Sequence, residues 1–299
     1  MPSLFTLLRR ARMRAEDFPA LYLSADELAG REQRQFFLLL RSNLLLLVFG
    51  AVLSLGSFEH WIVALLQAIV LLSALGFSVA LYTMRAERIW YAARALAESV
   101  KTLTWRYISR AEPFDASDEE AERLLQSRLA ATLRQNKELA RRFQTDLSAR
   151  QISEEMRAHR AEDLTKRIAS YKQSRISNQR AWYASKASEN AARSRSCFAV
   201  VVVANLLAVL SALLKIKFPE FDFWPTDVLV TVAAGVLAYM QSKRFSELAA
   251  SYALTAHEIG VVEEQLNQVR GEREFSLFVG DAENAFSREH TQWEARKDV

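Results

Sequence analysis

Four uncharged apolar stretches interrupt an otherwise charge-rich sequence, and they limit the possible folds more than any other feature. They cover residues 42–58, 61–84, 196–214 and 228–242, and none of them contains Asp, Glu, Lys or Arg. A helix of about 20 residues crosses a hydrocarbon core about 30 Å thick. Because the stretches form two pairs with short connections, we expect four membrane-spanning helices in two hairpins, the fourth lengthened to 224–242 by interfacial aromatic residues.

The alternative is a soluble helical bundle that buries all of these stretches. A helix on the surface of such a bundle carries polar residues at helical spacing. Residues 44–47 and 200–203 are instead apolar on every side of a helix. This pattern favours an integral membrane protein.

The rest of the chain is rich in helix formers and poor in helix breakers. The 299 residues include 8 Gly and 5 Pro, and no Gly lies between Gly76 and Gly235. Long runs without Gly or Pro favour helices. We therefore predict an all-α fold in which the membrane helices continue into long cytoplasmic helices that form a bundle.

The order of charged and apolar segments suggests four regions. Residues 1–19 are basic and amphipathic, residues 20–112 hold a first two-span unit, residues 113–150 form a cytoplasmic linker, and residues 151–299 hold a second two-span unit. The two units repeat one plan, in which a charged helix, a span, a short turn, a second span and another charged helix follow one another.

Several helix boundaries can be predicted more closely. The second span should continue beyond Met84 without a break, because neither Gly nor Pro follows until Pro113, and the fourth should likewise continue towards Gly271. Ser117 begins a Ser-x-x-Glu sequence with the spacing of a capping box, which predicts a helix start. A single helix is expected from about residue 150 into the third span.

Basic residues flank both apolar pairs at their outer ends, whereas the turn at 56–60 carries Glu59 and no Lys or Arg. The positive-inside rule then places the N terminus, the C terminus and the central region in the cytoplasm. The same juxtamembrane Arg and Lys residues predict contact with the lipid bilayer. This explanation accounts for the basic stretches, so nucleic acid is not expected as a partner.

The sequence offers no pattern typical of an enzyme or of a bound cofactor. His60, His159, His257 and His290 are scattered, and Cys197 is the only cysteine. No two of these residues have the spacing of metal ligands on one helix, and no Gly-rich phosphate loop occurs. We therefore expect neither catalysis nor a cofactor or metal site.

Polar and small residues within the spans are the candidates for a path through the membrane. They are Asn205, Ala208 and Ala212 in the third span, Gln67 and Gly76 in the second, and Gly235 in the fourth. Small residues let helices approach closely, and Asn or Gln can hydrogen-bond across helices. One interpretation is packing inside a single subunit. The other is a water-filled path that forms when several copies of the chain assemble.

A second group of candidates lies in the charged helix after the second span. Trp90, Arg94, Glu98, Lys101 and Trp105 recur at steps of three and four residues. Residues with this spacing share one stripe of a helix. The stripe predicts either ordinary helix packing or a contact that gates the membrane helices.

Two sets of residues resemble a known family. In the second half of the chain they are Arg175, Gln179, Trp182, Tyr183 and Trp293, with Tyr171, Lys186, Asn190 and Glu283 at matching positions. In the first half the resemblance rests more loosely on the stripe from Trp90 to Trp105. Both sets resemble the SLATT family, the two-transmembrane effector domains associated with bacterial second-messenger defence genes. The chain looks like two tandem units of this family, of which the C-terminal one matches better.

The resemblance implies a multi-pass protein of the bacterial inner membrane. Such an effector would form homo-oligomers and permeabilise or perturb the membrane when a nucleotide signal or a sensor protein reports phage infection. An alternative from a different class is a non-conducting scaffold whose cytoplasmic helices recruit a partner.

Overall fold

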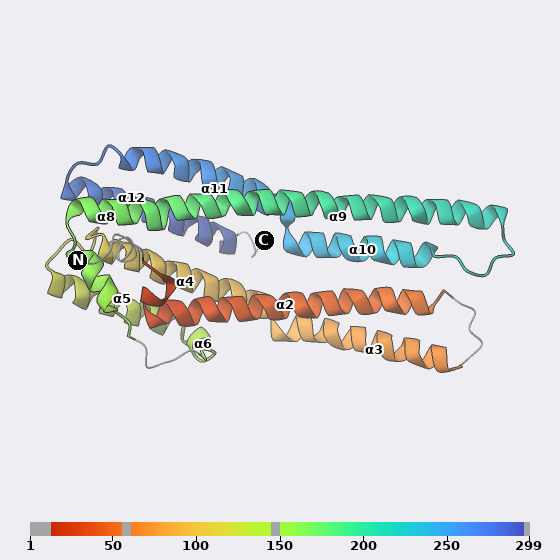
Figure 1. The fold of residues 1–299 in the computed structure, drawn as a ribbon. Helices are drawn as coiled ribbons and strands as arrows, with labels where there is room; N and C mark the ends of the chain where they lie inside the picture. The colour runs from red at the N-terminus through yellow and green to blue at the C-terminus, as the bar shows by residue number, and fades with distance from the viewer. Residues whose placement is uncertain (1–12, 56–60, 145–149, 296–299) are drawn as a thin grey trace, which may run out of the picture. The chain divides into compact units, whose positions relative to one another are not determined.

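The computed structural model of the chain describes residues 13–55, 61–144 and 150–295, with side chains up to residue 286. Within these residues all regular secondary structure is helical, which confirms the all-α prediction (Figure 1). The longer helices are α2 (Ala20–Leu53), α3 (Trp61–Met84), α4 (Ala86–Ile108), α5 (Asp118–Gln135), α9 (Asn178–Lys217), α10 (Thr226–Lys243), α11 (Phe245–Leu266) and α12 (Glu272–Ala295). The shorter ones are η1 (Ala15–Asp17), α6 (Lys137–Ala140), α7 (Glu154–Ala161), α8 (Leu164–Tyr171) and the π-helical turn η2 (Lys172–Ser177). The predicted turn at 56–60 and most of the predicted basic segment 1–19 lie outside the described residues.

Two helix starts follow from side-chain caps. Ser117 Oγ accepts the N–H of Glu120 at 3.4 Å, which confirms the predicted start of α5. Asp163 Oδ1 accepts the N–H of Lys166 at 3.0 Å and begins α8. The expectation of one helix from about residue 150 into the third span is wrong, because Asp163 caps the start of a new helix. Helices α7 and α8 are separate, because a side chain that caps a new helix satisfies N–H groups that the old helix would otherwise use.

In each hairpin, the second apolar helix ends before an arginine whose backbone is in the left-handed conformation. Arg85 has a φ of 48° between α3 and α4, and Arg244 has a φ of 51° between α10 and α11. The expectation that these helices continue without a break is therefore wrong. A left-handed residue other than Gly costs about 1–2 kcal/mol, so contacts of the flanking helices have to outweigh that cost. Neither Gly nor Pro marks these breaks in the sequence.

The structure divides into two compact units, and each is built from both halves of the sequence. Unit 1 comprises Met1–Gln33, Glu87–Tyr183 and Thr255–Val299, and unit 2 comprises Arg34–Ala86 and Ala184–Leu254. Unit 2 therefore holds α3, α10 and the apolar parts of α2 and α9. Unit 1 holds most of α4, all of α5 to α8, and α12.

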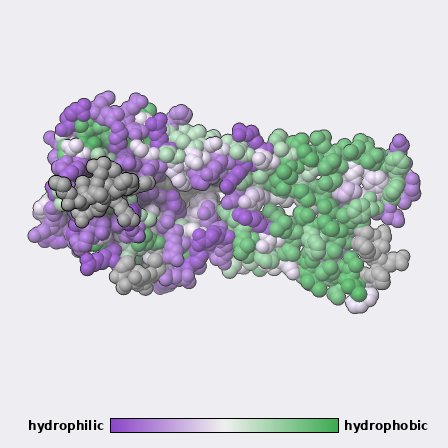
Figure 2. All heavy atoms as spheres, in the orientation of Figure 1, coloured by the Kyte–Doolittle hydropathy of each residue, from purple (hydrophilic) through white to green (hydrophobic). Residues whose placement is uncertain are grey.

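Small residues of unit 2 are buried at helix contacts, whereas many of its large apolar residues are exposed. Ala74, Ala204, Ala208 and Ala233 are at most 5% exposed, whereas Leu206 is 63% exposed. Figure 2 shows hydrophobic residues covering the visible surface over α3 and α10. Soluble proteins rarely expose so large an apolar surface, and small residues at helix contacts are typical of membrane bundles. Unit 2 is thus the membrane part of the protein.

Three helices among the described residues are long and apolar enough to cross a membrane, so the expected number of four is wrong. The three lie in Ala20–Leu53, Trp61–Ile108 and Leu164–Lys217. Helix α10 falls short because its 18 residues include Asp227 and Lys243. These two charges leave an apolar length below the roughly 20 residues that a span needs.

Unit 1 has an aromatic core. Trp105 of α4 contacts Tyr171 of α8 with 5.7 Å between ring centroids, and Tyr171 contacts Phe275 of α12 at 6.0 Å. All three side chains are buried. Edge-on ring contacts of this kind stabilise a core beyond the burial of their apolar area. The core holds α4, α8 and α12 together and brings the polar side chains of these helices into one place.

Candidate functional site

A buried arginine–glutamate pair lies at the centre of unit 1. Arg175 comes from the π-helical turn η2 and Glu283 from α12, and their side chains are 1% and 0% exposed. Arg175 Nε lies 2.8 Å from Glu283 Oε1, and Arg175 Nη2 lies 2.7 Å from Oε2. The guanidinium therefore donates two parallel hydrogen bonds to one carboxylate, which is the strongest common arrangement for such a pair.

Glu283 also receives two hydroxyl groups. The Tyr171 hydroxyl donates to Oε1 at 2.9 Å, and the Thr102 hydroxyl donates to Oε2 at 2.9 Å. One carboxylate thus joins α4, α8, η2 and α12. Thr102 was not singled out from the sequence, although it lies one helical turn after Glu98 of the predicted stripe.

Alternating charges continue from this pair along α4. Glu98 Oε2 lies 4.0 Å from Arg175 Nη1, and Arg94 Nη2 lies 2.9 Å from Glu98 Oε1. Arg94 Nη1 lies 3.1 Å from Asp26 Oδ1 of α2, and Lys101 Nζ lies 3.7 Å from Glu98 Oε2. We name Asp26, Arg94, Glu98, Lys101, Arg175 and Glu283 the charge cluster. Its three acids and three bases cancel, and pairing of this kind is what makes burial of the charges possible.

The electrostatics of the charge cluster keep Arg175 ionised. Burial by itself lowers the pKa of Arg175, but Glu283 and then Glu98 raise it, and the net pKa lies above the ordinary value. Lys101 behaves differently, because burial lowers its pKa more than Glu98 raises it. The Arg175–Glu283 contact is therefore an ion pair. Lys101 loses its proton more readily than an ordinary lysine.

The charge cluster is suited to holding the helices of unit 1 together. Both carboxylate oxygens of Glu283 already accept hydrogen bonds from Arg175, Tyr171 and Thr102. In the described part of the chain, no group of three or more His, Cys, Asp or Glu residues could hold a metal ion. Both oxygens of the Glu283 carboxylate are thus occupied within unit 1.

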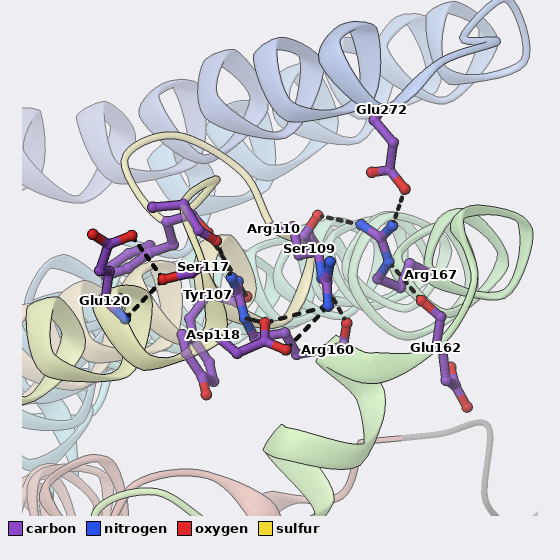
Figure 3. A network of polar contacts seen from close by, with 12 residues as sticks. Tyr107, Ser109, Arg110, Ser117, Asp118, Glu120, Arg160, Glu162, Arg167 and Glu272 are labelled. Atoms are coloured by element: carbon purple, nitrogen blue, oxygen red, sulfur yellow. Dashed lines mark hydrogen bonds and ion pairs between the residues drawn. The ribbon is translucent and has the colours of Figure 1, made fainter.

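Two further buried arginines hold the segment between α4 and α5 (Figure 3). Arg160 Nη1 donates to the carbonyls of Tyr107 at 2.7 Å and Phe114 at 2.9 Å. Arg167 Nη1 donates to the Ser109 carbonyl at 3.0 Å. Their acidic partners are Asp118 and Glu272. The sequence did not single out either arginine, because a partner that is a backbone carbonyl leaves no residue pattern.

A small cavity lies beside these arginines. Trp105, Ser109, His159 and Arg167 line it, and its volume is about 10 Å³. Trp105 Nε1 and His159 Nδ1 are buried and make no hydrogen bond within the described residues. A space of this size holds about one water molecule, which excludes a substrate-sized ligand.

The remaining predicted residues of unit 1 pack around its helices. Trp90 stacks on Tyr91 with 4.3 Å between ring centroids and packs against a small core formed by α2 and α4. Tyr183 is buried, and its ring contacts that of Trp182, which is 42% exposed. Gln179 is half-buried near the start of α9. The side chain of Trp293 lies outside the described ones.

The predicted residues Gln67, Gly76 and Gly235 of the apolar helices have different surroundings. Gln67 Nε2 donates to Ser54 Oγ at 2.5 Å and towards the Gly50 carbonyl at 3.4 Å, so Gln67 joins α3 to α2. Gly50, which the sequence did not single out, is a close-contact site: a Cβ there would lie 3.1 Å from a leucine side chain of α3. A Cβ at Gly76 or at Gly235 would meet no described atom within 4 Å.

Asn205 lies on the outside of α9. Ala204 and Ala208 are buried, whereas Asn205 and Ala212 are exposed. Asn205 Nδ2 donates to the Val201 carbonyl at 2.8 Å within the same helix. An Asn side chain has a second N–H and a carbonyl oxygen. Asn205 can therefore offer these groups to a partner outside the subunit.

Tyr171→Phe should change how the stability of the protein depends on pH. Burial and then Glu283 raise the pKa of Tyr171 well above its ordinary value. The stabilising contribution of such a group is complete below the unfolded pKa of about 10 and is lost as the pH rises through the folded pKa. We expect the melting temperature in detergent to fall more steeply above about pH 10 for the wild type than for Tyr171→Phe.

At pH 8 the same variant should melt at a lower temperature than the wild type, because a hydrogen bond to a charged group contributes about 1.5–3 kcal/mol. Tyr82→Phe, which alters an exposed tyrosine, should retain the wild-type slope. If the melting temperature fell equally steeply with pH in the wild type and in Tyr171→Phe, ionisation of Tyr171 would not contribute to the pH dependence of stability, which would contradict the prediction.

Comparison with known proteins gives two matches to family models. Residues 19–168 match the model described as SMODS and SLOG-associating 2TM effector domain 3, and residues 171–293 match the model described as SMODS and SLOG-associating 2TM effector domain 1. No curated protein and no solved structure matches the chain. The charge cluster contains residues of both matched regions: Arg94 and Glu98 come from the first, and Arg175 and Glu283 come from the second.

Proposed function

Because the chain belongs to the SLATT family of SMODS and SLOG-associating 2TM effector domains, we propose that it is an effector of the bacterial inner membrane in a nucleotide-signalled defence system. In this proposal, several copies of the chain assemble and open a path through the membrane. The observation that carries the proposal is Asn205, a polar side chain on the outside of an apolar helix.

Asn205 supports assembly because a polar group in hydrocarbon is costly without a partner. Interhelical hydrogen bonds made by Asn stabilise membrane helix association by about 0.6–2 kcal/mol. The small residues that face inward, Ala204 and Ala208, are already used within the subunit. A second copy of the chain is the simplest source of a partner for Asn205, and a ring of such contacts would line a polar path.

Unit 1 supports a role in receiving the signal. Its charge cluster joins residues of both SLATT regions, so a change at one region can alter the packing of the other. An upstream sensor protein or nucleotide that binds unit 1 would act through this connection. In this proposal, unit 1 receives the signal and unit 2 opens the path through the membrane.

A second candidate function is a non-conducting scaffold. Trp182 favours it, because a tryptophan that is 42% exposed on α9 is typical of a surface that binds another protein. In this function unit 1 recruits a partner, and unit 2 only anchors the chain in the membrane.

Membrane potential distinguishes the two functions. A voltage-sensitive dye would follow bacteria during controlled expression of the wild-type chain, with and without the defence signal. Depolarisation that grows with the membrane level of the protein is expected of the effector. An intact potential under every signal tested, at high membrane levels, would overturn the pore and favour the scaffold.

Cysteine labelling should place the α9–α10 connection and unit 1 on opposite sides of the membrane. Unit 1 collects three stretches of chain, which two apolar excursions separate. Helix α9 is long and apolar enough to cross the membrane, so the connection that follows α9 should lie on the side opposite the unit 1 residues that precede it. In a Cys197→Ser background, Asp222→Cys should react with an impermeant maleimide in spheroplasts, and Glu119→Cys only after permeabilisation.

Both positions are exposed, so the access of the maleimide to each cysteine depends on the side of the membrane on which that cysteine lies. The positive-inside rule makes the side of unit 1 the cytoplasm. Labelling of both cysteines under the same condition would contradict this topology.

A further inference from the structure

Two basic side chains of unit 2, Arg41 and Lys243, lie beside aromatic rings where its apolar helices end, and the charge of a third, Arg193, acts on Lys243. Arg41 lies directly before the first apolar stretch, Lys243 directly after the fourth, and Arg193 shortly before the third. Lys243 Nζ lies 3.3 Å from the centroid of the Phe37 ring, and Arg41 Cζ lies 5.7 Å from that of Tyr239. Cations over aromatic rings at the end of an apolar stretch are typical of the headgroup region of a membrane.

Acidic partners do not balance these cations. In the described part of the chain, Arg41 and Lys243 form no ion pair, and Arg193 lies 3.9 Å from Glu189. Glu189 is mainly bound by Lys186, whose Nζ lies 2.8 Å away. The other acidic residue nearby in sequence, Glu247, pairs with Arg244.

The cations act on one another. Burial and then the charges of Arg41 and Arg193 lower the pKa of Lys243 to about 8. Like charges that are held together without an anion are electrostatically unfavourable. An anion among the three side chains would relieve this repulsion and restore the charge of Lys243.

We propose that Arg41, Arg193 and Lys243 bind the phosphate of an anionic phospholipid, with the half-buried Tyr239 beside its glycerol and upper acyl chain. The position at the end of the apolar helices favours a lipid over a soluble phosphate, because the acyl chains would then lie along the apolar surface of unit 2. Basic pockets between membrane helices are suited to such headgroups. The site is independent of whether the protein conducts ions.

Native mass spectrometry of the full-length, delipidated protein would test the site by titration with phosphatidylglycerol. The test variant is Arg41→Gln/Lys243→Gln. The matched control is Lys215→Gln/Lys217→Gln, which also removes two exposed cations at the end of a helix. Lys217 resembles Lys243 in that its Nζ lies 5.3 Å from the centroid of the Phe218 ring. A basic residue that contacts an anionic headgroup contributes about fivefold in affinity, so the loss of two such contacts should weaken binding in the test variant roughly 25-fold.

The control variant should bind the lipid as the wild type does. Phosphatidylcholine should bind weakly to all three proteins, since it lacks net charge. Equal losses in the test and control variants would overturn the site. Inorganic phosphate that competes with the lipid at equal concentration would show a free-phosphate site and overturn the lipid assignment.

A second measurement does not depend on the folding of a variant. A neutral amine is the nucleophilic form of lysine, and a pKa near 8 makes Lys243 more reactive at pH 7.5 than an ordinary lysine. In wild-type protein in nanodiscs, acylation of Lys243 measured by mass spectrometry should be several-fold slower in phosphatidylglycerol than in phosphatidylcholine. Lys217 serves as the internal control. Equal acylation of Lys243 in both lipids would overturn the proposal.

Discussion

Glu283→Ala is expected to lower the melting temperature of the protein in detergent by roughly 10 °C. The substitution leaves the guanidinium of Arg175 buried without its carboxylate, and it removes the acceptor of Tyr171 and Thr102. Removing one partner of a buried ion pair costs about 3–5 kcal/mol, because the remaining charge is uncompensated. Differential scanning fluorimetry or calorimetry on the full-length chain would measure the change.

Asp281→Ala is the matched control, since Asp281 is an exposed carboxylate on the same helix. It should change the melting temperature by less than about 2 °C. Arg175→Met combined with Glu283→Leu should recover much of the loss, because apolar residues can replace a buried pair at little cost. A single Glu283→Ala variant that melts like the control would contradict the role assigned to the charge cluster.

Asn205→Leu is expected to abolish depolarisation while the protein still reaches the membrane. The leucine fits the exposed, apolar surroundings of position 205 and removes the amide that can bond to another subunit. Each lost contact is worth about 1 kcal/mol, but the loss recurs at every contact of a ring of subunits. Dye fluorescence at matched membrane levels would measure depolarisation, and cross-linking would measure assembly.

Ser73→Leu is the control for this experiment. Ser73 is likewise exposed on an apolar helix, and its hydroxyl donates to the Ile69 carbonyl at 2.8 Å within that helix. A serine hydroxyl has one donor hydrogen, so a hydroxyl that already donates within its own helix has no further donor to offer, unlike an amide. Depolarisation should therefore persist in Ser73→Leu. Full depolarisation by Asn205→Leu would remove Asn205 from the proposed path.

The stripe of α4 from Trp90 to Trp105 shows how far sequence spacing can predict a site. The steps of three and four residues put Arg94, Glu98 and Trp105 on one face of α4, because a helix has a fixed period. The partners of that face could not be predicted in this way. Arg175 and Glu283 are 108 positions apart, and no local rule links residues at such a separation.

The sequence by itself determined that the protein is helical and has a membrane part. Composition, the scarcity of Gly and Pro, and uncharged stretches are local properties, and local hydrogen bonding and transfer into hydrocarbon follow from them directly. The capping Ser117 is determined in the same way, since its partner Glu120 lies within the same turn.

Only the tertiary structure decided where helices break, which small residues are inside, and which charges are buried. Arg85 and Arg244 adopt a left-handed conformation that their own side chains disfavour, so contacts from other helices must impose it. Likewise Ala208 is buried while the neighbouring Asn205 is exposed, because the facing helix, and not the residue type, selects the inner side. These properties depend on contacts between distant parts of the chain, which spacing along one helix does not encode.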